Sequence, residues 1–498
     1  MKTTGFRLLQ LGTPWRNLSY IVIETDEGIS GIGEARVLGK THTVAEYLKD
    51  VERHFIGHDP FDIEALFRRF TLLDFGKAGE VVHTGLAMVE MAFWDIMGKA
   101  TNQPVYKLLG GKVQDKIQAY ANGWYTVERT PGSFALAASK VVSKGYKALK
   151  FDPFGNGDLE LSRNELFKSI EIIEAVSDAI TDDMQMMIEM HGRFAAHQAV
   201  EIANKIDQLN IGWIEEPVRP SDNPSLEKVR IQTSLPIATG ERLYGASEFR
   251  EIWSNNSVDI IQPDITQCGG IFETKKIAST AEIYSIMVAP HNVGGVISTL
   301  AAIHLCFTLR NVKILEHFND FADPFVKEAA NFYPEVKDGF FSVPEKPGWG
   351  VELNEDFILS HPPEKIKDLV IELNEFDVVI ASRYISEGGT DKEYGIFRLL
   401  LSKYSNFFIR VFLGIKVFDI TSGYKGYKSE VLKQIDFKKI ISTGYIFQSE
   451  MIFECNKKNF KIKEIPYVFR SRNFGNSKLT IKIIIEAVYK LFLISLKK

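Results

Sequence analysis

Cysteine is scarce in this chain of 498 residues, and long apolar runs are missing from it. Its three cysteines, Cys268, Cys306 and Cys455, are far apart and match no disulfide or zinc spacing, which predicts a reducing compartment. No stretch of about 18 apolar residues is free of charge, since Ile483–Leu496 contains a glutamate and a lysine. The first residues lack the apolar core of a signal peptide. We therefore expect a cytoplasmic protein without a transmembrane helix.

Charge is unevenly distributed along the chain. The net charge is −5, but residues 361–498 hold 24 Lys and Arg against 15 Asp and Glu, while the rest holds 35 against 49. This asymmetry predicts that the chain consists of two parts with different evolutionary origins or different binding partners. We expect no nucleic-acid partner.

A rhythm of about 25 residues runs through the middle of the chain. Six apolar runs each end in a charged residue or a histidine, at intervals of 26, 26, 23, 27 and 25 residues. Each interval fits one strand, one helix and two short loops. Six such units predict a (β/α)₈ barrel whose site lies at the C-terminal ends of its strands. The six residues are Glu189, Glu215, Glu241, Asp264, His291 and Glu316.

The rhythm also sets the predicted domain boundaries. Residues 1–115 do not follow it and predict a separate α+β domain, with a hairpin and three helices. Residues 116–335 form the barrel, with Ala119–Asn122 as its first strand. Residues 336–359 are rich in glycine and proline and return to the first domain, and residues 360–498 are a tail of different composition.

Three glutamates at successive strand ends predict a metal site. Glu189, Glu215 and Glu241 would repel one another unless a cation neutralised them. A set of oxygen ligands without Cys or His favours Mg²⁺. Glu216 must point away from Glu215 in a regular strand, so only one of the two can be a ligand. We choose Glu215, because it follows Trp213 by two residues and therefore lies on the same side of the strand.

Two histidines are candidates for proton transfer. His291 ends the seventh strand and Asp264 ends the sixth, so the pair can act as a base held by a carboxylate. A lone His291 would more simply be a loop residue. His191 follows Glu189 by two residues and faces His291 across the barrel, so the two can act on opposite faces of one substrate. Glu316 can hydrogen-bond the substrate or act as an acid.

The second strand, Ala148–Asp152, supplies a candidate lysine. Lys150 and Asp152 lie on the same side of this strand, and a lysine at the rim can neutralise a substrate carboxylate. The residues predicted to bind substrate are Lys150, Asp152, Arg242 and Glu316. A base can then remove the proton beside the carboxylate, Mg²⁺ stabilises the ene-diolate, and the second histidine protonates a departing 3-hydroxyl. The product is a 2-keto-3-deoxy acid.

These residues resemble the enolase superfamily, in its mandelate racemase and muconate-lactonising branch, over about residues 1–359. The resemblance implies a capping domain, a modified barrel, Mg²⁺ on the three glutamates and the Asp264–His291 dyad as base. The stretch IEMHGRF resembles dehydratases of galactonate, gluconate and arabinonate type. Asp152 stands where racemases carry a second catalytic lysine, which leaves His191 as proton donor. The matching motifs are GISGIGEA, AMVEMAFWDIMGKATNQPVYKLLGG, ALKFDPFG, IEMHGRF, WIEEP, ATGERL, QPDITQCGGI, APHNVGG and ILEHF.

The tail resembles the later half of a polyprenyl-phosphate mannosyltransferase over about residues 360–480. The motifs include FDVVIASRYISEGG, DITSGYKGYK and IKEIPYVFRSRNFGNSK, but the nucleotide-binding half and an Asp-x-Asp motif are missing. The tail is thus predicted to be a truncated glycosyltransferase-like α/β fragment, joined by gene fusion or as an assembly artefact. Tyr394–Phe418 fits either an amphipathic helix on a membrane surface or a core helix. The positions that match the family are Arg383, Gln448, Glu450, Arg470 and Arg472.

We therefore expect an Mg²⁺-dependent dehydratase of a sugar acid, a small-molecule substrate, and assembly as a homo-oligomer. Two alternatives stay open: a racemase or epimerase of the same superfamily, and a membrane-associated protein related to polyprenyl-phosphate glycosyltransferases. The first needs two bases beside one carbon and no leaving group, and the second needs a nucleotide-sugar site.

Overall fold

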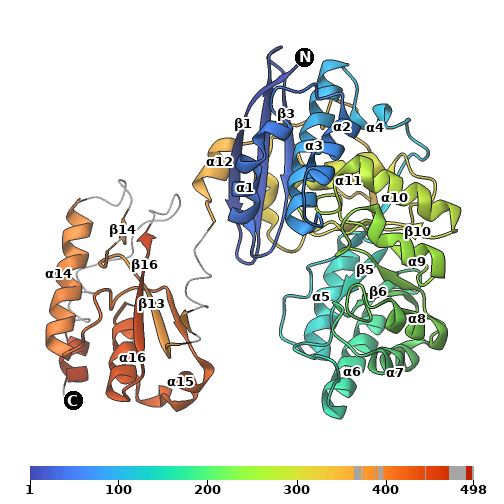
Figure 1. Ribbon diagram of the computed structural model, residues 1–498. Helices are drawn as coiled ribbons and strands as arrows, with labels where there is room; N and C mark the ends of the chain where they lie inside the picture. The colour runs from blue at the N-terminus through green and yellow to red at the C-terminus, as the bar shows by residue number, and fades with distance from the viewer. Residues whose placement is uncertain are drawn as a thin grey trace. The chain divides into compact units, whose positions relative to one another are not determined.

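The computed structural model divides into two compact units, Met1–Pro363 and Glu364–Lys498. It describes residues 1–363, 372–373, 375–386, 388–390, 396–442, 445–469 and 489–495. Figure 1 shows the elements of each unit. The candidate site lies entirely within the first unit.

The first unit begins with an antiparallel sheet covered by helices (Figure 1). The last strand packs so closely against the long helix α3 that a Cβ on Gly31 or Gly33 would collide with the carbonyls of Ala92 and Met88. This packing fixes where the end of the strand meets the barrel. The elements are β1 (Thr3–Gly12), β2 (Asn17–Thr25), β3 (Ser30–Ala35), α1 (Thr41–Asp50), α2 (Ile63–Leu72), α3 (Glu80–Ala100) and α4 (Val105–Leu108).

Eight parallel strands follow and form a closed ring. Strand β11 pairs with β4, and Val288 of β10 bridges to Val312 just before β11. Each of these strands thus has a neighbour on both sides, and the ring has no edge strand. The strands are β4 (Ile117–Ala121), β5 (Ala148–Phe151), β6 (Gln185–Glu189), β7 (Ile211–Glu215), β8 (Ile237–Thr239), β9 (Ile260–Ile261), β10 (Met287–Val288) and β11 (Leu315–His317).

Helices alternate with the strands, as the 25-residue rhythm predicts. They are α5 (Pro131–Ser143), α6 (Arg163–Ala179), α7 (Ala196–Ile206), α8 (Asn223–Gln232), α9 (Arg250–Asn255), α10 (Ile271–Ile283) and α11 (Val296–Cys306). After β11 the pattern changes, because the chain forms a 3₁₀ helix, Pro324–Ala329, and β12 (Phe340–Phe341), which pairs antiparallel with β4. The barrel is therefore a modified (β/α)₈ barrel.

The segment after β12 returns to the N-terminal sheet. The indole of Trp349 is buried and donates to the Ile32 carbonyl at 2.8 Å, and its backbone N–H donates to Asp95 at 2.9 Å. Helix α12 (Glu355–Ser360) lies against β1, and Arg7 forms an ion pair with Glu355 at 2.6 Å. The first and last parts of this unit are thus packed into one body.

The second unit has a small mixed sheet. Strand β13 (Val378–Ser382) lies between β15 (Lys425–Tyr427), which is antiparallel to it, and β16 (Ile462–Pro466), which is parallel. Further elements of its described residues are β14 (Gly389–Thr390), β17 (Val468–Phe469), α14 (Ile396–Leu413), α15 (Ser429–Gln434) and α16 (Tyr445–Lys457). The predicted helix over Tyr394–Phe418 coincides largely with α14, although Tyr394 and Gly395 lie outside the described residues.

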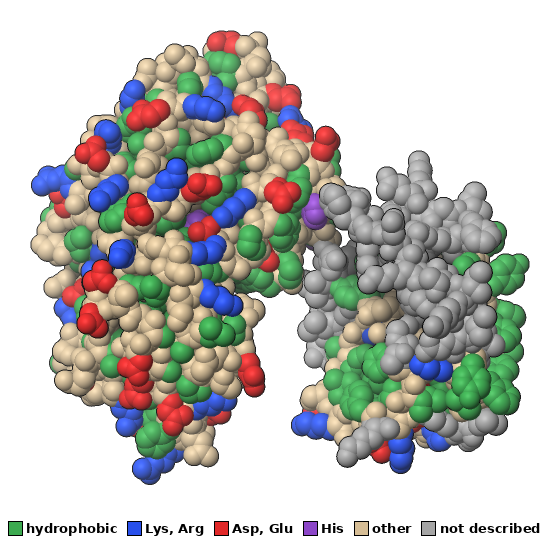
Figure 2. Space-filling view, turned by 180° about the vertical axis from the view of Figure 1, so that it is seen from behind, with side chains coloured by type: hydrophobic (Ala, Val, Ile, Leu, Met, Phe, Trp, Pro, Cys, Tyr) green, Lys and Arg blue, Asp and Glu red, His purple; other side chains and the backbone are tan. Residues whose placement is uncertain are grey.

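Apolar side chains are exposed on this second unit (Figure 2). On α14 they include Tyr404, Phe407 and Val411, each more than 60% exposed. None of the helices that the structure describes is long and apolar enough to cross a membrane. Of the positions that suggested a glycosyltransferase, Arg383 forms an ion pair with Asp419, whereas Arg470 and Arg472 lie outside the described residues. The resemblance of the tail to a mannosyltransferase stays a prediction.

Candidate active site

The candidate site is the layer of side chains directly above the core of the barrel. Eight buried residues, one from each strand or its edge, fill the interior: Tyr120, Ala148, Met187, Trp213, Ala238, Ile260, Ala289 and Ile314. Because side chains alternate along a strand, residues two positions further on also point inward, one layer nearer the C-terminal ends. That layer comprises Asn122, Lys150, Glu189, Glu215, Gly240, Gln262, His291 and Glu316.

The fifth strand departs from this register. Gly240 occupies the inward position with a φ of 130°, and Glu241 follows one residue later. A Cβ at Gly240 would lie 2.9 Å from the ring of Phe249, so the glycine is needed there. The turn that it makes brings Glu241 toward the other two glutamates.

Glu189, Glu215 and Glu241 converge as the sequence predicts. Each offers a carboxylate oxygen, and these oxygens lie within 4.8 Å of one another. Glu189 and Glu215 are buried, and Glu241 is 15% exposed. Glu215 is oriented by Trp213, whose indole donates to it at 2.9 Å, and by Gln262, whose amide donates at 2.6 Å. Three converging carboxylates, all oxygen donors, fit a hard divalent cation such as Mg²⁺.

Lys150 does not lie at the rim, where the sequence placed it. Its side chain is 2% exposed, and its Nζ contacts Glu215, Glu189 at 3.1 Å and Glu316 at 3.2 Å. Its position two residues after the inward-facing Ala148 of β5 directs it into the barrel, where it is buried. Burial alone would lower the pKa of Lys150, but the surrounding carboxylates raise it well above its ordinary value. Lys150 is therefore a buried cation among carboxylates.

Glu316 is held as a carboxylate rather than as an acid. Asn122 donates to one of its oxygens at 2.7 Å, and the backbone N–H of Asn292 donates to the other at 2.7 Å. Burial would raise the pKa of Glu316, but Lys150 and His291 lower it to about 2. The alternative that Glu316 acts as the acid is therefore not supported.

The predicted Asp264–His291 pair is present. His291 Nδ1 and Asp264 Oδ2 are 2.7 Å apart, and the other oxygen of Asp264 accepts from the backbone and the hydroxyl of Thr266. The second ring nitrogen of His291 lies 3.3 Å from Glu241. Burial would lower the pKa of His291, but Glu241, Glu316 and Asp264 raise it to about 9.

Asp152 holds a histidine, although the sequence suggested that it binds substrate. Its Oδ2 lies 2.6 Å from His191 Nδ1, and both of its oxygens accept hydrogen bonds from Arg193, at 2.8 and 2.7 Å. The side-chain alternation that placed it beside Lys150 stops at Phe151, where β5 ends. Burial would lower the pKa of His191, but Glu189 and Asp152 raise it to about 9.

Arg242, also predicted to bind substrate, is paired within the protein. It contacts both oxygens of Glu216, with Nε at 3.1 Å, and lies 3.9 Å from Glu241. Glu216 has a φ of 41° just after β7, is buried, and is absent from the three-carboxylate cluster. The ion pair between Arg242 and Glu216 leaves Glu215 as the residue that faces the centre.

Several residues of the site were missed by sequence reasoning. Asn122 and Gln262 lie in the inward layer. Sequence reasoning would have found them if the alternation of side chains had also been applied to uncharged residues at the ends of strands. Arg36 is buried beside the loop that carries Asp264, because its carbonyl accepts from Gln267 at 2.8 Å. Its guanidinium lies 6.0 Å from the ring of Trp15, and Nε has no hydrogen-bond partner. Only its position after the GISGIGEA motif could have signalled it.

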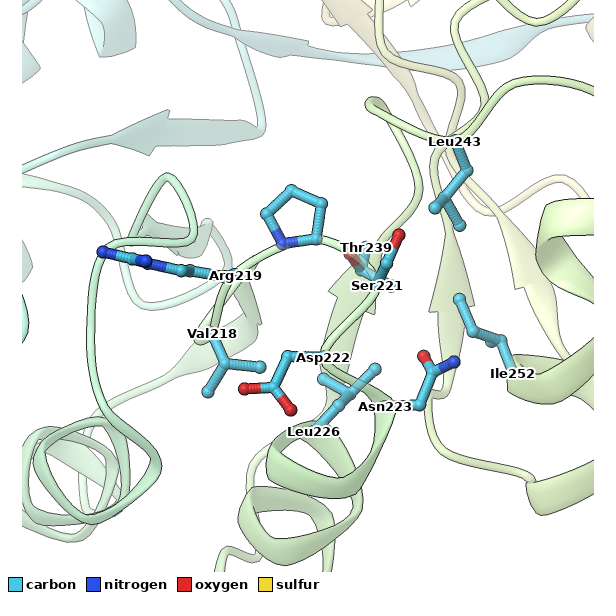
Figure 3. A pocket seen from close by; sticks show the side chains of 10 residues that line it. Val218, Arg219, Ser221, Asp222, Asn223, Leu226, Thr239, Leu243 and Ile252 are labelled. Atoms are coloured by element: carbon cyan, nitrogen blue, oxygen red, sulfur yellow. The ribbon is translucent and has the colours of Figure 1, made fainter. Parts of the chain in front are cut away.

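A small pocket lies beside the site but is not part of it (Figure 3). It is lined by Val218–Asn223, Leu226, Thr239, Leu243 and Ile252, and its volume is about 10 Å³. That is room for about one water molecule, so a sugar acid cannot enter it.

Comparisons with known proteins agree with this geometry. Residues 13–110 match the mandelate racemase/muconate lactonizing enzyme N-terminal domain, and residues 133–357 match the enolase C-terminal domain-like family. The D-gluconate dehydratase of Thermoproteus tenax is 36% identical over 344 residues, which is 68% of this chain and 69% of that protein. This chain belongs to the enolase superfamily.

Further relatives support the same family. The D-gluconate/D-galactonate dehydratase of Picrophilus torridus is 34% identical over 69% of this chain and 88% of its own length. A crystal structure of a mandelate racemase/muconate lactonizing enzyme from Jannaschia sp. CCS1 has a TM-score of 0.69 and 32% identity, and covers 73% of this chain and 98% of that one. The prediction of an enolase-superfamily enzyme related to acid-sugar dehydratases is confirmed. Both family models end by residue 357, so the second unit lies outside the residues that they match.

Proposed function

We propose that this protein is an Mg²⁺-dependent dehydratase of a sugar acid and forms a 2-keto-3-deoxy acid. The observation that carries the proposal is a pair of carboxylate-held histidines, His291 with Asp264 and His191 with Asp152. They adjoin two members of one cluster of three glutamates, Glu241 and Glu189. Dehydration needs one group to accept a proton and another to donate one, and this arrangement provides both.

The three glutamates, Glu189, Glu215 and Glu241, are the groups that would hold the cation. Bound there, Mg²⁺ would supply positive charge that stabilises negative charge developing on the substrate. Lys150 adds a second positive charge in the same layer, held by Glu215, Glu189 and Glu316. Preorganised charge of this kind favours the form of the substrate that carries an extra electron pair on its carboxylate oxygens.

His291 is the base in this scheme. Its Nε2 accepts the proton from the carbon beside the carboxylate, while Nδ1–H donates to Asp264 and keeps the ring oriented. His191 donates a proton to the 3-hydroxyl as the C3–O bond breaks, so that water leaves. The electron pair of the former C–H bond forms the new C=C bond, and the enol then becomes the 2-keto-3-deoxy acid.

A racemase or epimerase is the second candidate. It needs a base on each face of one carbon and no leaving group. The position two residues after Lys150 holds Asp152, which is bound to His191 and Arg193, so that position offers no second base. This favours dehydration.

The substrate class rests on the relatives. Those named above are a D-gluconate dehydratase and a D-gluconate/D-galactonate dehydratase, so we propose an aldonic acid of this kind. Arg36 and Trp15, which belong to the N-terminal domain, are candidates to contact the hydroxyl groups of this acid that lie far from its carboxylate. A cytoplasmic location and a homo-oligomer stay predictions.

The proposal is tested by incubating the full chain with a set of aldonic and aldaric acids and Mg²⁺. We expect semicarbazide to detect a 2-keto-3-deoxy product from an aldonic acid, and His291→Asn and Glu241→Gln to abolish it. Proton NMR of the same mixtures would reveal epimerised substrate. Epimerisation without a keto product would favour the racemase, and no conversion of any acid would contradict both.

A further inference from the structure

Two buried glutamates reach from the N-terminal domain into the barrel. Glu34 lies on β3 and is fully buried, and Glu90 lies on α3 and is 2% exposed. Neither forms an ion pair with any residue of the described chain. Both carboxylates instead accept hydrogen bonds from backbone N–H groups at the start of a barrel helix.

Glu34 caps helix α11. One of its oxygens accepts from the N–H of Gly295, and the other accepts from Ile297 at 2.9 Å and Ser298 at 3.2 Å. A carboxylate at this end of a helix satisfies N–H groups that have no partner inside the helix, and it interacts favourably with the helix dipole.

Glu90 caps helix α10 in the same way. Its two oxygens accept from Ile271 at 2.9 Å and Phe272 at 2.8 Å. The indole of Trp94, one turn further along α3, donates to Glu90 at 2.6 Å and fixes its orientation.

These two helices follow the two loops that carry the proposed base. Asp264 lies in the loop of residues 262–270 that leads to α10, and His291 lies in the loop of residues 289–295 that leads to α11. Each loop ends in two glycines, Gly269–Gly270 and Gly294–Gly295. A Cβ on Gly270 would collide with Glu90, and one on Gly295 would lie 3.0 Å from Glu34, so both glycines leave room for a carboxylate.

The loop after His291 has a further tie to the same domain. Arg16 donates to the Val293 carbonyl and to the Asn319 side chain, and Asn319 donates to the Gly294 carbonyl at 2.8 Å. Both loops are short. A displacement of the first residues of α10 or α11 would therefore also displace Asp264 or His291.

We infer that Glu34 and Glu90 are positioning residues, through which the N-terminal domain sets the distance between Asp264 and His291. In this role the N-terminal domain does more than cover the substrate. It also keeps Asp264 and His291 at hydrogen-bonding distance from each other. This inference rests on the proposed function for its kinetic consequence, but the geometry of the pair can be tested without substrate.

The test uses Glu34→Gln and Glu90→Gln in the full chain loaded with Mg²⁺. Glutamine keeps the shape but removes the charge and replaces one acceptor oxygen by an NH₂ group. The control is Asp95→Asn, because Asp95 is also a buried carboxylate of α3 that accepts from backbone N–H groups, those of Ile32 at 3.0 Å and Trp349 at 2.9 Å, but touches neither loop. Unlike the two glutamates it also forms an ion pair, with Lys99 at 2.8 Å, so the control removes at least as much stabilisation.

Two measurements separate positioning from stability. The imidazole N–H signal of His291, assigned with His291→Asn, should shift or broaden in both glutamine variants without any substrate present. With a substrate, kcat should fall roughly 10- to 100-fold while KM changes less than about threefold, since a small misplacement of a reacting group has an effect of this size. Asp95→Asn should lower the melting temperature but leave the signal and kcat as in the unchanged protein.

The inference would be overturned if both glutamine variants had the same His291 signal and the same kcat as Asp95→Asn. If a glutamine variant does not fold, Glu34→Asp and Glu90→Asp keep the charge but shorten its reach, and should give a smaller effect of the same kind. If no sugar acid is converted, the proposed function fails, whereas the histidine signal still decides this inference.

Discussion

Individual side chains at the centre of the barrel are bound to partners that their sequence positions do not reveal. Lys150 is the clearest case, since a lysine at the end of a strand is usually solvated, yet three carboxylates surround this one. Burial of a charge is costly unless it is paired, and here the pairing is provided by residues from three other strands.

The choice between Glu215 and Glu216 can be tested at the scale of one residue. Glu215→Gln should weaken Mg²⁺ binding by at least about 100-fold, because it removes an oxygen ligand from the cluster. Glu216→Gln makes the same chemical change one residue later, but its carboxylate is paired with Arg242, so the loss should stay below about tenfold. Isothermal titration with Mg²⁺ measures both, and equal losses would contradict the assignment.

Asp152 provides a second prediction for a single side chain. Asp152→Asn should lower kcat by roughly 100-fold, because His191 loses the carboxylate that orients it as proton donor. Mg²⁺ affinity should stay within about threefold of the original, since Asp152 is not in the cluster. Asp158→Asn, an exposed carboxylate of the same loop, is the control. A kcat that is unchanged by Asp152→Asn would show that His191 needs no such partner.

At the scale of elements, the ends of strands were predictable and the segments beyond them were not. The apolar runs that end at Glu189 and Glu215 are strands β6 and β7, which end at those residues. His191 and Glu216 come after a strand end and have positive φ values of 49° and 41°, so the alternation of side chains does not apply to them. Their contacts depend on the loops of neighbouring units.

Helix α11 gives a prediction about pH. His304 is buried between Tyr106 and Trp349 and accepts a hydrogen bond from the Tyr106 N–H at 3.1 Å. Its other ring nitrogen has no hydrogen-bond partner among the residues that the structure describes. Burial therefore lowers the pKa of His304 to about 3, well below its value of 6.5 in an unfolded chain. Between these values the unfolded state binds a proton that the folded state does not, so stability falls as pH falls.

The free energy of unfolding should thus decrease by roughly 3 kcal/mol from this residue between pH 6.5 and 4, at about 1.4 kcal/mol for each pH unit. Urea unfolding at several pH values measures it. His304→Gln, which cannot titrate, should unfold with a shallower dependence on pH. A slope that is the same in both proteins would contradict the argument.

At the scale of the whole molecule, the chain contains a unit that matches the enolase superfamily and a second unit that the family models do not match. The first unit holds every residue of the candidate site, and the family models match only within it. Each unit also has a hydrophobic core of its own. All the residues of the candidate site therefore come from the first unit.

This separation predicts that a chain ending at Pro363 will fold and keep the activity of the full chain. We expect kcat and KM within about twofold, since no residue of the site is removed. Solubility should be equal or better, because the second unit exposes apolar side chains such as Tyr404 and Phe407. Activity measured beside a sedimentation assay tests both, and a large loss of kcat would show that the second unit contributes to catalysis.

The barrel and its three converging glutamates could be predicted from the amino-acid sequence. This was possible because buried strands, short connections and a period of about 25 residues leave few other arrangements for an acidic residue at each strand end. The partner of each charged group became known from the folded chain alone. Lys150 with Glu316, Asp152 with His191, and Glu34 and Glu90 with the starts of α11 and α10 join segments far apart in the chain, and such pairings follow from packing in space rather than from local pattern.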